Sequence, residues 1–486
     1  MSPPAQENSG KSRKWGCHAL QIPAGYKLTP IQRMRLPILL SLALVLAEPL
    51  WAEAPSIAGT LPEDLVPQLK PLLKASVERS PNTISAAIAV AEQEASKLGA
   101  RAILLPSLNL NSSYQSTRET ESGSSASPPS SGVFYGASIN QPVFHWGAYK
   151  NQADMADLGL KISERQYADA YRQLAVSIRN QYLGLITRKI AVRNAKFAQK
   201  LDQERLEAAQ AKFETGAMSA AEVGSFKLTV EQAQLYTDRA LEDLAYYKRI
   251  FTRLVGIDDL DDDSIPIELP HPEYSKQTAD AVLTNFVGEG IENTLQNQVY
   301  LMTIKQQDLS YDIAKVRLLP RFDANASYNY SDYTSVGSHS ITQVGITSEA
   351  YSVAANWTIF DGFATRSAKL YALETKRYYE RQKKTYVDSS IDTATYMRHQ
   401  IDFAARSMAF LELHNTLIAA EVKRFNDDQK LGYGSQATID AGTQNLYATE
   451  YDMVYARSDY LNQWTGFISL TGLDPALDNI SPRYVH

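Results

Sequence analysis

The sequence predicts a mainly α-helical fold in which one structural unit occurs twice, each unit holding a pair of β-strands and a long helical hairpin. Short segments mark the repeat. Leu-Leu-Pro at residues 104–106 returns at 318–320, an offset of 214, and Phe144 and Phe360 close two alternating blocks, an offset of 216. Leu-Val-Gly at 254–256 corresponds to Leu-Thr-Gly at 470–472. Because this period is too long for a solenoid, it indicates duplication of a whole unit.

Residues 1–52 have the pattern of a secretory signal peptide. Arg33 and Arg35 precede a short apolar core at residues 36–47, and the small residues Ala52 and Ala54 offer cleavage positions. The core is too short to span a bilayer as a helix. Because the stretch before it is unusually long, Met34 is an alternative start. A buried helix in a cytosolic protein is the other interpretation of the core.

The cysteine and charge content narrows the class of protein. The single cysteine, Cys17, lies upstream of the apolar core and lacks a lipobox, so we expect a cysteine-free exported chain that is not a lipoprotein. The net charge of −6 becomes about −10 when residues 1–52 are removed, because they carry six basic and two acidic side chains. An acidic chain argues against nucleic-acid binding.

Four blocks alternate between apolar and polar residues, which predicts strands at 107–116, 133–144, 321–330 and 350–360. Polar loops are expected at 116–132 and 331–348. The alternation fits either a membrane β-barrel or a half-buried sheet in a soluble protein. Aromatic residues at the strand ends favour a membrane interface: Phe144, Trp146, Trp357, Phe360 and Phe363. Since no apolar run after residue 52 approaches twenty residues, insertion would require a closed barrel.

The helical half of each unit is unusually long. Proline is absent from Gly147 to about Phe213 and from Gly362 to about Lys430, which predicts two long helices. The return helices carry a 3-then-4 spacing that begins at Val223 and at Ile439 and is typical of coiled-coil packing. One further helix is expected before each strand pair, at 62–102 and 276–317.

These elements divide the chain into a first repeat at 53–257, a linker at 258–276, a second repeat at 277–474 and a tail at 475–486. The linker opens with an acidic run at 258–263 and contains three prolines. It lacks the Asp-x-Asp-x-Asp-Gly loop with its closing Glu that binds calcium, so we expect a solvated linker.

No catalytic motif is present. The seven histidines show no metal-ligand spacing, and the chain has neither a Gly-rich phosphate loop nor a Gly-x-Ser-x-Gly elbow. We therefore expect no enzymatic activity, metal or cofactor.

The order of the motifs resembles the outer membrane efflux protein family, the TolC-like channels, over about residues 60–475. The segments that carry the resemblance are Leu105-Pro106-Ser107-Leu108, Gln141-Pro142-Val143-Phe144, Lys212-Phe213-Glu214-Thr215-Gly216, Leu254-Val255-Gly256-Ile257, Leu319-Pro320-Arg321-Phe322, Trp357-Thr358-Ile359-Phe360-Asp361-Gly362 and Leu470-Thr471-Gly472-Leu473. Each segment is weak alone, but the ordered set occurs twice.

The resemblance implies a homotrimer in the outer membrane of a Gram-negative bacterium, with a twelve-stranded barrel continued by an α-helical periplasmic tunnel. It implies a passive channel that docks a periplasmic adaptor protein and an inner-membrane pump or ABC exporter. A tripartite efflux pump and a type I secretion system are both compatible with this chain. The alternative is a soluble periplasmic coiled-coil scaffold in which the alternating blocks form a capping sheet.

The resemblance also places the gate and the adaptor contact at the periplasmic tips of the helical hairpins. Here these positions are Phe213, Gly216, Glu222, Gly432, Tyr433, Gly434 and Asp440. The family spacing from glycine to a pore-facing acidic residue fits Glu222 and Asp440, whereas the repeat offset aligns Glu222 with Thr438. The family's tip arginine is absent, with Gln436 or Gly434 in its place. For Asp440, a carboxylate favoured by the helix dipole is the alternative role.

Overall fold

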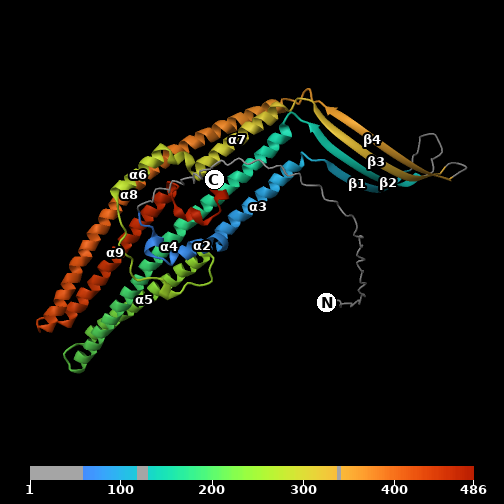
Figure 1. Cartoon of the computed structure of the whole chain (residues 1–486). Helices are drawn as coiled ribbons and strands as arrows, with labels where there is room; N and C mark the ends of the chain where they lie inside the picture. The colour runs from blue at the N-terminus through green and yellow to red at the C-terminus, as the bar shows by residue number, and fades with distance from the viewer. Residues whose placement is uncertain (1–58, 118–129, 337–340, 486) are drawn as a thin grey trace, which may run out of the picture. The chain divides into compact units, whose positions relative to one another are not determined.

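The computed structural model describes residues 59–117, 130–336 and 341–485, and the predicted leader with Cys17, Met34, Ala52 and Ala54 lies outside them. The described chain is mainly helical and carries one four-stranded sheet (Figure 1). The predicted fold class, mainly helical with a small sheet, is confirmed.

Among the helices of the described ranges, none has an apolar stretch long enough to cross a membrane.

The sheet joins the two repeats. Its strands are β1 (Ser107–Thr117), β2 (Ser130–Phe144), β3 (Arg321–Val336) and β4 (Ile341–Asn356), antiparallel in the order β1-β2-β3-β4 (Figure 1). The predicted end of β3 at residue 330 and the predicted start of β4 at residue 350 were wrong, because the ladder continues through the expected loop at 331–348 as far as Val336 and Ile341. The predicted end of β4 at residue 360 was also wrong. The last pair is Arg321 with Asn356, and Pro320 before it has no N–H for the ladder.

The register separates an apolar face from a polar face. Leu108 lies opposite Ile139, Ile139 opposite Ala326, and Ala326 opposite Tyr351. Leu108 and Tyr351 on the outer strands are 65% and 79% exposed, Ile139 is 46% exposed and Ala326 is half-buried. On the other face, the two adjacent cross-strand rows are mostly polar: Ser107, Asn140, Asn325 and Ser352 in one, and Asn109, Ser138, Ser327 and Ala350 in the other. The sheet therefore presents one exposed apolar face, and β1 and β4 are its free edges.

A short helical segment precedes each strand pair, and in both repeats it is broken rather than continuous. The expected helix at 62–102 consists of α1 (Pro62–Leu65), α2 (Leu69–Arg79) and α3 (Pro81–Ala102). Ser80 caps α3 and Pro81 occupies its first turn, so the chain must restart the helix there. The expected helix at 276–317 consists of α6 (Lys276–Gly288), η2 (Gly290–Asn293) and α7 (Leu295–Lys315).

Two long hairpins make up most of the chain. They are α4 (Ala148–Glu214) with α5 (Ala220–Val255), and α8 (Ala364–Lys430) with α9 (Gln436–Leu470) (Figure 1). Each long helix has 67 residues, which corresponds to about 100 Å at about 1.5 Å per residue. The hairpins touch through α4 and α9, and nearer the sheet the order of contacts is α3-α4-α7-α8.

Left-handed backbone conformations recur at one fixed offset. Positive φ angles occur at Gly216 and Gly432, at Gly256 and Gly472, and at two residue pairs, Trp146-Gly147 and Gly362-Phe363. Every member lies 216 residues from its counterpart, so both repeats reverse the chain at equivalent points. In the strand-to-helix turns the glycine is the second residue of the first pair (Gly147) and the first residue of the second pair (Gly362), and the other residue of each pair is aromatic.

The linker and the tail are packed segments. In the linker, the acidic residues at 258, 259 and 261–263 are exposed, as expected. Leu260, Ile265 and Leu269 are buried in the helical core, so the expectation of a solvated linker was wrong for these apolar residues. Its acidic run lies against Lys248, whose Nζ is 2.8 Å from Asp262 Oδ1. The tail forms the short helices η3 (Pro475–Asn479) and η4 (Pro482–Tyr484). It packs on α4, where the rings of Tyr484 and Tyr167 are 4.4 Å apart.

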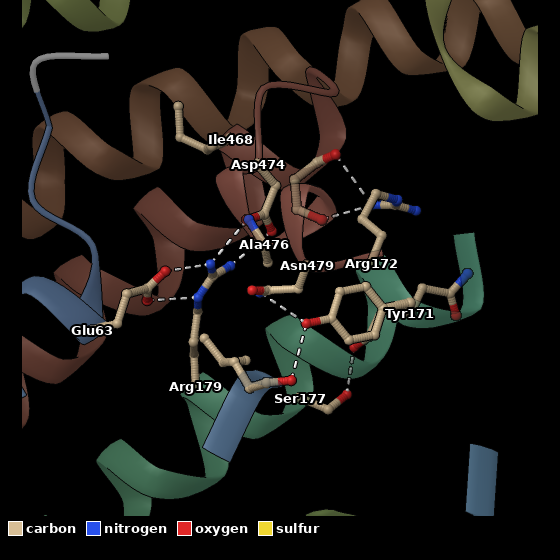
Figure 2. Close-up of polar contacts among 12 residues, drawn as sticks. Glu63, Tyr171, Arg172, Ser177, Arg179, Ile468, Asp474, Ala476 and Asn479 are labelled. Atoms are coloured by element: carbon tan, nitrogen blue, oxygen red, sulfur yellow. Dashed lines mark hydrogen bonds and ion pairs between the residues drawn. The ribbon is translucent and has the colours of Figure 1, made fainter. Parts of the chain in front are cut away.

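A buried arginine of α4 joins the two ends of the described chain. The Arg179 side chain is 0% exposed and donates to Glu63 of α1 at 2.8 and 2.6 Å and to Asp474, after α9, at 2.7 and 2.9 Å (Figure 2). Burial opposes the positive charge, but the hydrogen bonds and attraction from the two carboxylates outweigh it and raise the pKa of Arg179 above its ordinary value.

Neutral hydrogen bonds extend this cluster. Tyr171 Oη donates to the carbonyl of Leu73 at 3.0 Å and accepts from Asn479 Nδ2 at 3.1 Å (Figure 2). Arg172 donates to Ser469 at the end of α9 at 2.7 Å. One stretch of α4 is thus bonded both to the segment before the first strand pair and to the segment after the last helix.

Arg179→Met should cost about 3–5 kcal/mol in the free energy of unfolding, because two carboxylates would remain in the core without a cation. Arg205→Met is the matched control. Arg205 pairs with Asp202 on the same helix but is 49% exposed, so its loss should cost no more than about 1 kcal/mol. Urea unfolding of both variants measures the difference, and equal losses in the free energy of unfolding would contradict the stabilising role of Arg179.

Two equivalent glycines allow a test of backbone strain against steric clash. A Cβ at Gly256 would lie 2.1 Å from the carbonyl oxygen of Arg79, whereas a Cβ at Gly472 meets nothing within 4 Å. The left-handed conformation alone should cost Gly472→Ala about 1–2 kcal/mol. Gly256→Ala should cost clearly more, because the backbone of α2 must also move. Thermal unfolding of both variants checks this order, and a larger loss for Gly472→Ala would contradict it.

Candidate functional site: the hairpin tips and the strand-to-helix turns

The two hairpin tips share one backbone motif. At the end of α4, Gly216 N donates to the carbonyl of Phe213 at 2.9 Å, and Ala217 N donates to the carbonyl of Lys212 at 2.8 Å. At the end of α8, Gly432 N donates to the carbonyl of Gln429 and Tyr433 N to that of Asp428, each at 2.9 Å. A glycine with positive φ ends both long helices, as is common for helix C-termini.

The tips expose apolar side chains. Phe213 is 48% exposed in the first tip, and Leu431 and Tyr433 are 71% and 87% exposed in the second. Neighbouring exposed apolar groups of this kind are typical of contact surfaces. Phe213 and Tyr433 are among the residues that the sequence placed at the tips, and Leu431 stands in the same turn, directly before Gly432.

Glu222 caps the return helix of the first tip. Its Oε2 accepts from Ser219 N at 2.7 Å and from Ser219 Oγ at 2.8 Å, while Ser219 Oγ accepts from Glu222 N at 3.3 Å. This reciprocal arrangement is a capping box. The hydrogen bonds from the Ser219 backbone and side chain hold the pKa of Glu222 below its ordinary value.

Asp440 is not the counterpart of Glu222. In the second tip Ser435 caps α9, and its Oγ accepts from Thr438 N at 3.2 Å, so Thr438 occupies the position of Glu222. Asp440 lies two residues further along and accepts from Gln436 Nε2 at 2.7 Å. The offset of 216 therefore holds through the tips. Gly434, also predicted as a tip residue, lies against the backbone of Gln429, with a Cβ position 2.9 Å from its N atom.

The aromatic residues predicted at the strand ends gather at the strand-to-helix turns. Trp146 Nε1 donates to the carbonyl of Pro320 at 2.8 Å, and Trp357 Nε1 donates to the carbonyl of Leu318 at 3.0 Å. Both indoles thus bond the Leu-Leu-Pro segment that precedes β3, while the two tryptophans stay 43% and 64% exposed. An apolar ring with a satisfied N–H suits a membrane interface.

The remaining aromatics of this set form exposed pairs. Phe144 lies 4.9 Å from Trp146, and Phe360 lies 5.5 Å from Phe363, measured between ring centroids. Phe363 holds a left-handed conformation with φ of 69°. Such a conformation costs a non-glycine residue about 1–2 kcal/mol, so the aromatic side chain is kept at this turn against a local preference.

A buried histidine supports the first of these turns. His145 Nε2 lies 2.9 Å from Asp323 Oδ1 of β3, and the His145 ring stacks on Tyr149 of α4 with centroids 4.1 Å apart. The contact ties the second repeat's sheet to the first repeat's long helix. The partner of His145 lies 178 residues away in the chain, and nothing in the sequence indicated this contact.

Comparison with known proteins gives a consistent picture. Residues 72–246 match the model of the family described as outer membrane efflux protein. No curated protein matches the sequence. Among solved structures, VceC of Vibrio cholerae is 15% identical with a TM-score of 0.63, covering 86% of this chain and 100% of VceC. The CmeC channel of Campylobacter jejuni is 14% identical with a TM-score of 0.65, covering 87% and 90%.

A third structure, the open state of the MtrE outer membrane channel of Neisseria gonorrhoeae, is 15% identical with a TM-score of 0.62, covering 84% of this chain and 89% of MtrE. At these identities the likeness shows the fold. The resemblance to the outer membrane efflux protein family, inferred from the repeated motifs, is confirmed by the family match over the first repeat.

Proposed function

We propose that this protein is a passive outer-membrane channel, because residues 72–246 match the outer membrane efflux protein family and 84–87% of the chain shares the fold of solved outer-membrane proteins of this kind. Three copies close a twelve-stranded barrel and a helical tunnel. The tunnel tips dock a periplasmic adaptor protein and an inner-membrane pump or ABC exporter. The channel serves a tripartite efflux pump or a type I secretion system.

The observation that carries this proposal is that one chain has two free edges in its sheet and two in its layer of hairpin helices. In the sheet the free edges are β1 and β4. At the level of the hairpins the order of contacts is α5-α4-α9-α8, so α5 and α8 stand at the edges. A chain with two different free edges associates head to tail, and such contacts close into a ring when the rotation allows it.

The edge helices expose apolar stripes at coiled-coil spacing. On α8, every seventh residue from Tyr396 to Leu417 is large, apolar and 56–67% exposed: Tyr396, Phe403, Phe410 and Leu417. On α5, Leu228 and Leu235 are 67% and 69% exposed. Burying such side chains contributes about 1.5–3 kcal/mol each. These stripes support side-by-side packing of helices from different copies.

The sheet supports insertion into the membrane. Its exposed apolar face runs from the aromatic turns at Phe144 and Trp357 toward Tyr114, and a lipid-facing band flanked by aromatics is typical of outer-membrane strands. In the alternative function, a soluble coiled-coil scaffold, another protein surface instead of lipid would have to cover this apolar face.

The test is to express the chain with its leader, extract it from membranes in detergent and image single particles. Three-fold particles with a long hollow stalk, together with a trimer mass from light scattering, are expected. A water-soluble monomer or dimer would contradict the channel and favour the scaffold.

The tip carboxylates should set ion selectivity, because acidic side chains repeated around a narrow pore attract cations. In planar bilayers, Asp440→Asn and Glu222→Gln should each lower the cation-to-anion permeability ratio. Glutamine can keep the capping box of α5, so a change in Glu222→Gln would report charge rather than unfolding of the tip. An unchanged reversal potential would remove that carboxylate from the pore lining.

A further inference from the structure

We infer that the strand-to-helix turns bind anionic phospholipids through four exposed basic side chains that lie next to the aromatic residues of the turns. These four residues, the basic collar, are Lys150, Lys315, Arg317 and Arg366. The ligand is a lipid headgroup whose phosphate charge is not neutralised by an amine of the same lipid. This inference rests on the proposed outer-membrane channel, and it adds the class of lipid that the chain prefers at one membrane interface.

The sign of the charge reverses where the sheet meets the helices. The whole chain is acidic, with 48 basic and 54 acidic side chains. The ten residues on the helical side of each strand together hold six basic and three acidic side chains, in the segments 97–106, 145–154, 311–320 and 357–366. Clusters of basic side chains directly outside a membrane span attract anionic lipids, whereas an acidic surface repels them.

Two of the six basic residues are paired inside the chain. Lys97 and Arg101 both contact Asp157 of α4, at 3.4 and 2.6 Å. The four residues of the basic collar are exposed, and none of them forms an ion pair with another residue of the described ranges. Their charges are therefore available to a ligand outside the chain.

The repeat places two collar residues at equivalent points, against the local preference of a helix. Lys150 is the third residue of α4 and Arg366 is the third residue of α8, 216 positions later. The first turn of a helix favours acidic side chains because of the helix dipole, as Glu222 illustrates in α5. The first turns of α4 and α8 contain no acidic residue. A cation is thus present in both repeats where the helix itself does not favour one.

The tryptophans bring the collar and the aromatic turns together. Trp146 Nε1 donates to the carbonyl of Pro320 at 2.8 Å. Trp357 Nε1 donates to the carbonyl of Leu318 at 3.0 Å, and Arg317 directly precedes Leu318 in the chain. Both indoles therefore lie close to the segment that carries Arg317. Aromatic rings settle at the level of the headgroups, where a neighbouring long basic side chain can reach a lipid phosphate.

The carboxylate of Asp361, near Arg317, is occupied by the start of α8. Its Oδ2 accepts from Thr365 N at 2.8 Å and from Thr365 Oγ1 at 2.6 Å. These hydrogen bonds, with a smaller attraction from Arg317, hold the pKa of Asp361 below its ordinary value. Because Asp361 serves as a helix cap and forms no ion pair with Arg317, it leaves the guanidinium free to bind a phosphate.

Tryptophan quenching tests this inference at the turns themselves. Trp15 and Trp51 lie in the predicted leader, and Trp464 is buried with 1% exposure, so Trp146 and Trp357 are the tryptophans that lipid can contact. The processed chain is reconstituted in phosphatidylcholine vesicles that contain either brominated phosphatidylglycerol or brominated phosphatidylcholine. Because bromine quenches only nearby indoles, comparing the two titrations gives the relative affinity of the turns for the anionic lipid.

The wild-type protein should prefer phosphatidylglycerol several-fold at low salt, and less at high salt, because salt screens exposed charges. Replacing all four collar residues by glutamine should make the two lipids bind about equally. Lys150→Gln alone and Arg366→Gln alone should each remove part of the preference, which keeps the test decisive if the fourfold variant does not fold. 

The matched control removes four exposed basic side chains from the hairpins, and it should keep the wild-type preference. Its substitutions are Lys227→Gln, Arg239→Gln, Arg253→Gln and Lys423→Gln. Equal quenching by the two lipids in the wild-type protein would overturn the inference, and so would a full preference in the collar variants. In both cases, strong quenching by both lipids would leave the proposed channel intact. If neither brominated lipid quenched the tryptophans, the turns would lie outside the bilayer and the proposed channel would be contradicted as well.

Discussion

The charge of Arg179 is the constraint on which the helical core depends. A guanidinium with 0% exposure needs compensating carboxylates, and the chain supplies one from each end of its described length, Glu63 and Asp474. The cost of desolvating these three groups is offset only when all are correctly placed. The cluster therefore stabilises one arrangement, in which α4 lies against both the first short helix and the end of α9.

Around the Arg179 cluster the molecule consists of two repeats of one unit, and neither repeat can bury its own apolar surfaces. Each unit leaves an apolar sheet face and an apolar helix stripe uncovered, and pairing the two units inside one chain covers only the inner edges. The outer edges keep Tyr351 and Phe410 exposed at 79% and 67%. Duplication thus explains why the chain is long, and the exposed outer edges support the proposed association of several copies.

The tips show how a duplicated unit diverges at its ends. The backbone motif that ends α4 is repeated at the end of α8, including the left-handed Gly216 and Gly432. The capping side chains differ, because Glu222 completes a capping box in the first repeat, whereas Thr438 occupies that position in the second repeat. Backbone reversal favours a glycine in both tips, whereas the side chains around it differ between the two repeats.

The sequence by itself determined the repeat, the helical hairpins, the strand pairs and the residues of the turns, because these follow from local periodicity and from positions that only glycine or proline favours. Trp146 and Phe363 were predicted at the strand ends from their aromatic side chains, and the structure shows that they form the strand-to-helix turns. Sequence reasoning could not assign Asp323 to His145 or Asp474 to Arg179, since those partners lie 178 and 295 residues apart. It also extended β4 too far and left the linker in solvent, because the end of a ladder and the burial of Ile265 depend on neighbours that only the tertiary structure brings together.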